Sequence, residues 1–170
     1  VADARYLHTE LKGALTAEST ISGTVSRPEA QLSVALKDEA RTLSLAAFMH
    51  MEDTLLRFTE IKGGAKGLDI SGALTYDMQT TLANGKLRLE AGDLSGLNAF
   101  LAADVKGSGN ADVTLTGANG RQRVDAQGTF SGIGYGDKNI SSATLQFHAS
   151  DVMALEGIDA GVKANDLRIG

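Results

Sequence analysis

The sequence predicts an all-β protein: an elongated, curled sheet of antiparallel or mixed strands that forms an open hydrophobic groove, with one short helix near its middle. Apolar residues recur at every second position in many short runs, which is the pattern of strands with one apolar face. Glycine occurs 20 times and proline once, so chain reversals depend on Gly, Asn and Asp. Because glycine spread through these runs destabilises helices but is tolerated at bulges in sheets, a mostly helical fold is disfavoured.

The alternating runs predict at least eight strands. Each places its apolar side chains on one face and its polar side chains on the other. In chain order, the runs are marked by Leu32, Val34 and Leu36; Leu43 and Leu45; Leu56 and Phe58; Leu68 and Ile70; Leu87 and Leu89; Val113 and Leu115; Leu145 and Phe147; and Leu167 and Ile169.

Turn signals separate these runs. Asn84-Gly85 and Asn119-Gly120 predict two tight hairpins, because Asn-Gly readily adopts the two positive φ values of a type I′ turn. Gly107-Ser108-Gly109 is interpreted as a turn and not as a nucleotide loop, since the following residues alternate as a strand instead of opening a helix. Weaker turn signals occur at 37–40, Glu52-Asp53, Gly63-Gly64 and Gly136-Asp137, and Gly63 to Gly67 lacks the spacing of a phosphate loop.

One segment departs from the alternation. Between Asp93 and Ala103, apolar residues follow helical spacing and Asp93 or Ser95 is available as the N-cap, which predicts a short helix. This segment divides the chain into a first β unit, 1–92, a helical hinge, 93–103, and a second β unit, 104–170. The chain starts at Val1 and stops within an alternating run, so we expect it to be a piece of a longer protein.

Composition excludes several classes of function. The net charge is −5 and the basic residues are scattered, which argues against nucleic acid as a partner. Aromatic residues make up 5% of the chain and tryptophan is absent, so stacking platforms for sugars or single strands are not expected. The chain has no cysteine, which excludes disulfides and thiolate chemistry, and it contains no apolar run long enough for a transmembrane segment.

The sequence offers no strong catalytic or metal-binding motif. The histidines His8, His50 and His148 lie far apart in the chain and lack ligand spacing. Met49, His50 and Met51 have the chemistry of a copper(I) site, but on a strand the methionines face away from the histidine. Two carboxylates on neighbouring strands could serve glycoside cleavage, although no aromatic subsite accompanies them. We therefore expect no enzyme activity, no metal and no cofactor.

The apolar face is the remaining candidate site. One interpretation is an ordinary sandwich or barrel whose core these residues form. The alternative is an open trough whose apolar wall takes up lipid acyl chains, since large exposed apolar patches commonly mark binding surfaces. The residues predicted to line that groove are Met49, Met51, Leu56, Phe58, Ile70, Leu87, Leu89, Val113, Leu115, Phe130, Leu145 and Phe147.

Several stretches resemble a known family. LKGALT (11–16) with ISGTVSRPEAQL (21–32), and later LDISGAL (68–74), LRL (87–89), LSGLNAF (94–100) and GSGNADVTL (107–115), are similar to repeats of the translocation and assembly module TamB family, within the AsmA-like group. The chain departs from such repeats in carrying a single proline, Pro28.

The resemblance implies a periplasmic segment of a protein tethered to the inner membrane, with a hydrophobic groove. It implies phospholipid acyl chains and outer-membrane β-barrel assembly proteins as partners. A scaffold or chaperone module that pairs an exposed sheet edge with client strands is the alternative, and a secreted β-helix or sandwich with carbohydrate activity is a third hypothesis.

Overall fold

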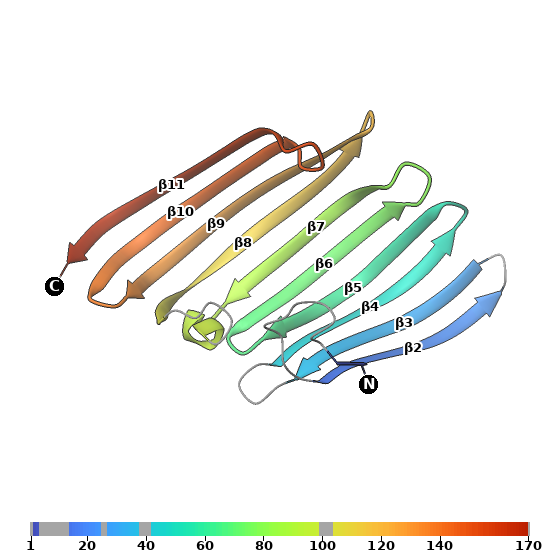
Figure 1. Cartoon of the computed structure of the whole chain (residues 1–170), viewed down its shortest axis with the longest axis horizontal. Helices are drawn as coiled ribbons and strands as arrows, with labels where there is room; N and C mark the ends of the chain where they lie inside the picture. Colours follow the sequence, from blue (N-terminus) through green and yellow to red (C-terminus); the bar gives the residue numbers. More distant parts are fainter. Residues whose placement is uncertain (1, 4–13, 25–26, 38–41, 99–103, 170) are drawn as a thin grey trace.

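The computed structural model describes residues 2–3, 14–24, 27–37, 42–98 and 104–169. These residues form a single antiparallel sheet of eleven strands in which the spatial order of the strands is their order in the chain, an uninterrupted meander (Figure 1). The strands are β1 (Ala2–Asp3), β2 (Ala14–Thr24), β3 (Arg27–Lys37), β4 (Thr42–Glu52), β5 (Leu55–Ala65), β6 (Leu68–Asp77), β7 (Leu82–Ala91), β8 (Val105–Ala118), β9 (Arg121–Tyr135), β10 (Lys138–Asp151) and β11 (Glu156–Ile169). The prediction of an all-β, open sheet is confirmed.

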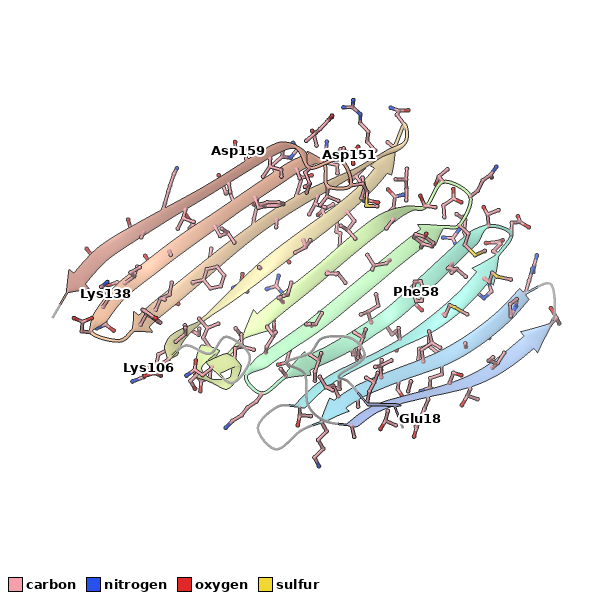
Figure 2. The ribbon with its side chains drawn as sticks, in the orientation of Figure 1. Glu18, Phe58, Lys106, Lys138, Asp151 and Asp159 are labelled. Atoms are coloured by element: carbon pink, nitrogen blue, oxygen red, sulfur yellow. The ribbon has the colours of Figure 1, made fainter. Side chains whose placement is uncertain are left out.

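The sheet has no second layer among the described residues. The chain exposes 11142 Å² to solvent, against about 7,900 Å² for a compact monomer of this size. No large side chain in the described part of the chain is fully enclosed, and four of its seven buried apolar residues are alanines. The sandwich and barrel interpretations, which need a packed core between layers, are therefore wrong. Figure 2 shows side chains projecting from one layer of strands, Phe58 from β5 and Asp159 from the outermost strand.

The register gives the sheet one apolar and one polar face, because directly paired residues of antiparallel strands share a face. The central row of the apolar face runs from Ile70 to Leu89, Ala111, Gly128, Leu145 and Val162 across six strands. A parallel row runs from Gly72 to Leu87, Val113, Ala126, Phe147 and Ala160. We call this side the apolar face and the opposite side the polar face.

A bulge in β5 keeps the apolar face continuous where the sequence alternation changes phase. Leu56 and Phe58 occupy even positions, whereas the next buried apolar residue, Ile61, occupies an odd one. The register of β5 shifts on both sides of this point, and Glu60 adopts a left-handed conformation with φ of 50°. The extra residue turns Ile61 back onto the side that Phe58 occupies.

The Asn119-Gly120 hairpin is confirmed. Both residues have positive φ, 54° and 72°, as a type I′ turn requires, and they join β8 to β9. The turn signals at Glu52-Asp53 and Gly136-Asp137 also lie at strand ends. The signal at 37–40 falls largely outside the described residues.

The other Asn-Gly pair does not form the predicted turn. Asn84 and Gly85 lie inside β7, and the preceding hairpin turns at 78–81, where Thr81 has φ of 59°. Gly85 faces Leu74 of β6 and Leu115 of β8, and a Cβ at Gly85 would lie only 2.8 Å from the Leu74 Cα. Glycine therefore permits the close approach of β6 at this position.

Two glycine-rich segments predicted as turns are also strand residues. Gly63 and Gly64 lie in β5, and Gly107-Ser108-Gly109 lies in β8, where the pairing with β9 shifts register near Gly107. At Gly63 the missing side chain leaves room for the Leu45 side chain on the paired strand. In both cases glycine marks a close approach or a bulge within a strand.

The predicted helical segment begins as expected. Asp93 caps a 3₁₀ turn, η2 (Leu94–Leu97), because its carboxylate accepts a hydrogen bond from the Ser95 N–H at 2.9 Å. Residues 99–103 lie outside the described residues. On either side of this segment β7 and β8 pair directly, from Gly85 with Leu115 to Ala91 with Gly109, so the sheet continues through it. The division into two units, 1–92 and 104–170, stays a prediction.

Candidate binding surface

The twelve predicted groove residues lie on one face of the sheet. Met49 pairs with Phe58, and Met51 pairs with Leu56, across β4 and β5. The remaining residues follow through the same ladder of neighbours, in the pairs Ile70 with Leu89, Leu87 with Val113, Gly85 with Leu115, Ala143 with Phe130, Gly128 with Leu145, and Ala126 with Phe147. The alternation in the sequence therefore identified the face of each residue, while their role as lipid contacts stays a prediction.

All twelve side chains are half-buried. Side chains on the adjacent strands bury them, since no second layer lies over them in the described part of the chain. Where those neighbours are small or missing, exposure rises: Val34 in β3 is 40% exposed, and Ile158 and Val162 in β11 are 52% and 68% exposed. The apolar face thus keeps exposed side chains from β3 to β11 in the described part of the chain. Extended exposed apolar surface of this kind commonly marks a binding surface.

The polar face carries several ion pairs among the described residues. Arg88 contacts Glu90 at 2.7 Å and Asp112 at 3.1 Å, and these acidic partners raise the pKa of the guanidinium. His50 lies 3.5 Å from Glu29 on this face, whereas Met49 and Met51 lie on the apolar face. This separation agrees with the expected strand geometry, and no group of three metal-ligating side chains occurs among the described residues. His8 lies outside them.

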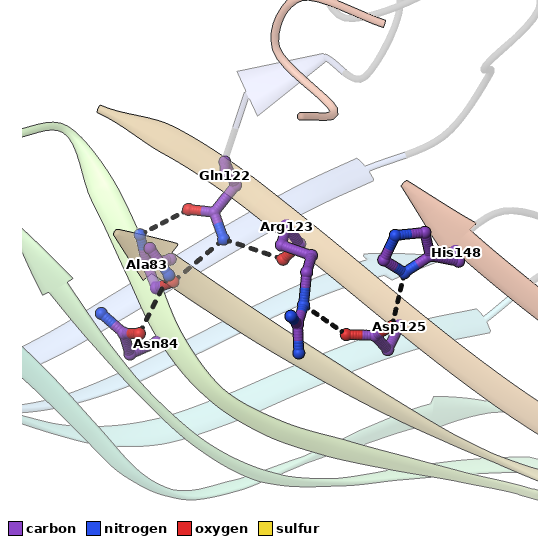
Figure 3. Close-up of polar contacts among 7 residues, drawn as sticks. Ala83, Asn84, Gln122, Arg123, Asp125 and His148 are labelled. Carbon is purple, nitrogen blue, oxygen red and sulfur yellow. Dashed lines mark hydrogen bonds and ion pairs between the residues drawn. The ribbon is translucent and has the colours of Figure 1, made fainter. Parts of the chain in front are cut away.

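The strongest charged cluster joins β9 to β10. His148 Nδ1 lies 2.7 Å from one carboxylate oxygen of Asp125, and Arg123 Nε donates to the other at 2.8 Å (Figure 3). The hydrogen bond from His148, followed by the charge of Arg123, holds the pKa of Asp125 below its ordinary value. All three side chains are more than one-third exposed, so the cluster is a surface feature.

This cluster borders a shallow hollow on the polar face that also bears on the carbohydrate hypothesis. The hollow, about 370 Å³, is lined by Asp125, Gln127, Gln146, His148 and Asp159, among others. Two carboxylates thus share one depression. A glycosidase needs one carboxyl with a raised pKa as its general acid, whereas the pKa of Asp125 is lowered. Asp125 therefore does not have the chemistry of that general acid.

Gln122 is a buried polar residue that the sequence did not single out. The β7–β8 ladder stops at Gly85, and beyond it Gln122 of β9 reaches across β8 to β7. Its side-chain amide accepts from the Ala83 N–H at 2.7 Å and donates to the Ala83 carbonyl at 3.0 Å, which replaces a strand neighbour (Figure 3). Gly117 lies between them without a side chain, and its N–H donates to the Asn84 side chain.

The second buried polar residue closes the same end of the sheet. Asp151, at the end of β10, accepts from the Met153 N–H at 3.1 Å and from the Gln122 N–H at 3.4 Å. The Val152 N–H donates to the Gln122 carbonyl at 2.8 Å. Gln122 is thus held by the β10–β11 turn while its side chain holds β7, so the residue ties three segments together.

Fold and surface together define a class: an open, single-layer antiparallel β protein with one continuous apolar face. No family model, no curated protein and no solved structure matches this chain. Among the described residues, the structure contains no helix that is long and apolar enough to cross a membrane.

Proposed function

We propose that the chain is a non-enzymatic module whose apolar face binds phospholipid acyl chains. The observation that carries this proposal is the half-buried apolar face, which extends over ten strands with no covering layer in the described part of the chain. Each CH₂ group moved from water onto such a surface contributes about 0.8 kcal/mol. Rows of Leu, Val, Phe and Ala offer similar contacts from strand to strand. The binding free energy of an acyl chain is therefore similar at successive positions, and no single position traps it.

The resemblance to TamB-like repeats sets the context of this proposal. In that context the chain is a periplasmic segment of an inner-membrane-anchored protein, and the apolar face forms part of a path for phospholipid toward the outer membrane or serves the assembly of outer-membrane β-barrel proteins. The half-buried apolar rows supply the surface that such a path needs.

The test compares two neighbouring positions of β7 that lie on opposite faces of the sheet. Leu89 lies on the apolar face, and Arg88 is exposed on the polar face with Asp112. A photo-reactive residue is placed at either position, and the purified protein is irradiated with phospholipid and analysed by native mass spectrometry. We expect lipid adducts from position 89 and none from position 88. Equal labelling at both positions, or no adduct at either, would refute the proposal.

A second candidate function rests on a different observation. Among the described residues no strand pairs with the outer edge of β11, a 14-residue strand. Such an edge offers a row of backbone donors and acceptors that a further strand can pair with. In this candidate the chain is a strand-pairing scaffold or chaperone, and changes at β11 affect its activity more than changes in the polarity of the apolar face.

A further inference from the structure

The tip of the β8–β9 hairpin carries a reactive asparagine, and we propose that Asn119 is a site of spontaneous deamidation through attack of the Gly120 backbone nitrogen on its side chain. The same dipeptide at Asn84-Gly85 is protected by the sheet around it. The proposal is independent of lipid binding at the apolar face and of strand pairing at β11. It rests on a comparison within the chain, in which one short sequence occurs in two different structures.

The two sites have almost the same covalent surroundings. The sequence is ANGK at 83–86 and ANGR at 118–121. In both, the residue after asparagine is glycine, so no side chain hinders approach of the backbone nitrogen to the asparagine amide. The residue after the glycine is basic in both. The two asparagines therefore have nearly equal intrinsic reactivity, and a difference between them in the folded chain reports the structure.

At Asn119 the reacting groups are free to meet. Asn119 and Gly120 form the exposed turn between β8 and β9, at the upper edge of the sheet in Figure 1. The strand ladder stops at the pair of Ala118 with Arg121. Neither the Asn119 side chain nor the Gly120 N–H has a hydrogen-bond partner in the part of the chain that the structure describes. A Cβ at Gly120 would meet nothing within 4 Å, so the space beside this nitrogen is open as well.

At Asn84 the same groups are held in the sheet. Asn84 and Gly85 lie inside β7, where Gly85 pairs with Leu74 of β6 and with Leu115 of β8. The Asn84 side-chain oxygen accepts a hydrogen bond from the Gly117 N–H at 2.9 Å. Rotation about the Asn84 Cα–C bond is needed to bring the Gly85 nitrogen to the side chain, and strand pairing on both sides opposes it. The reaction at Asn84 therefore requires local opening of the sheet.

The reaction needs no co-reactant other than water. The Gly120 nitrogen loses its proton to solvent and forms a bond to the Asn119 Cγ. The bond from Cγ to the side-chain nitrogen breaks, and that nitrogen takes up a proton and leaves as ammonia. Water then opens the resulting cyclic imide at one of its two carbonyl carbons. The product is aspartate or isoaspartate, in which the main chain runs through the former side chain.

Peptide mapping by mass spectrometry tests the proposal on the full chain, because each conversion replaces an amide NH₂ with OH and raises the mass of its peptide. The folded protein and a sample unfolded in guanidinium chloride are incubated in parallel at mildly alkaline pH. In the unfolded sample we expect Asn84 and Asn119 to react at similar rates. In the folded sample we expect Asn119 to react at least about tenfold faster than Asn84, since each contact that must open first lowers the reactive population.

Two outcomes of this comparison would overturn the proposal. One is an equal rate at both sites in the folded chain, which would show that the sheet does not protect Asn84. The other is protection of Asn119 in the folded chain as complete as that of Asn84, which would show that the turn does not bring its reacting groups together. The unfolded sample makes both outcomes decisive, because it measures the intrinsic rate of each site.

A single substitution assigns the reaction to its residue. Asn119→Gly removes the amide and leaves Gly-Gly, a dipeptide that also suits a type I′ turn. We expect the mass rise of the peptide that contains 118–121 to disappear in this variant, while circular dichroism shows the same fold and Asn84 stays protected. A mass rise that persists in Asn119→Gly would place the reaction at another residue and overturn the proposal.

Discussion

The inner strands and strand β11 carry the same alternating sequence. They differ in how far the flanking strands bury their apolar side chains. In β7, Leu89 has Ile70 on one side and Ala111 on the other, and its side chain is half-buried. In β11, Val162 has Leu145 on one side and no strand on the other among the described residues, and it is 68% exposed. In a one-layer sheet the flanking strand supplies the cover that a second layer supplies in a sandwich.

The comparison extends to the glycines of the two regions. A Cβ at Gly109 of β8 would collide with the Phe130 ring of β9 and lie 2.6 Å from the Thr129 carbonyl oxygen, whereas a Cβ at Gly161 of β11 would meet nothing. At these two positions the inner strand uses glycine to accept a side chain from its neighbour, and β11 does not. Stability should depend strongly on inner positions and weakly on matched positions in β11.

The largest expected effect is at Gly109. Gly109→Val forces two branch methyl groups against the Phe130 ring and the β9 backbone, and we expect the free energy of unfolding to fall by about 3 kcal/mol. Gly161→Val is the matched control, and its unfolding free energy should change by about 0.5 kcal/mol or less. Chemical denaturation followed by far-UV circular dichroism measures both. Equal losses at both sites would show that an adjacent strand is not what distinguishes the two regions.

The next effect is at Gln122. Gln122→Ala leaves the N–H and carbonyl of Ala83 without the contacts that replace a strand neighbour, which should cost about 2 kcal/mol of stability. Hydrogen exchange at the Ala83 amide should become faster than at amides in β9. Gln127→Ala, at an exposed polar-face position of the same strand, serves as the control with little expected change. An unchanged exchange rate at Ala83 would contradict the bridging role.

A smaller difference is expected between two truncations on the apolar face. Leu89→Ala removes half-buried methyl groups between two strands and should cost about 1.5 kcal/mol, while Val162→Ala should cost less than about 0.5 kcal/mol. The same two variants sharpen the functional comparison. Loss of the lipid-bound species in native mass spectra of Leu89→Ala alone would place lipid over the inner strands, and equal loss in Val162→Ala would extend the lipid path to β11.

The sequence predicted the faces of the inner strands well because the period-two pattern acts locally. Twelve residues chosen by parity alone lie on one face, even though the bulge at Glu60 changes the parity within β5. The two Asn-Gly pairs show the limit of prediction from local sequence. The turn predicted at Asn119-Gly120 is correct, and the turn predicted at Asn84-Gly85 is wrong. The two dipeptides are identical, but Gly85 pairs with Leu74 of β6 and Leu115 of β8, so strands on both sides hold it in the sheet.

Gln122 and the β11 edge were beyond prediction for a related reason. The role of Gln122 depends on where β7 and β8 stop pairing, and that point is set by contacts between strands distant in sequence. Along β11, alternation was recognised only at Leu167 and Ile169, because small residues such as Ala160, Gly161 and Ala164 weaken the apolar signal.

The smallest expected effect comes from the charged cluster between β9 and β10. Changing it tests whether contacts on the polar face contribute to the stability of the inner strands. The pKa of Asp125 is lowered in the folded chain by His148 and Arg123, so the folded state favours the ionised carboxylate more than the unfolded state does. The resulting stability is present above the ordinary carboxyl pKa of 3.8 and is lost as the pH falls through the lower folded value. Asp125→Asn should therefore flatten the stability profile in that acidic range. Asp137→Asn, in the exposed β9–β10 turn, should leave the profile unchanged, and the same flattening in both variants would show that net charge, and not the contact with His148, sets the acid response.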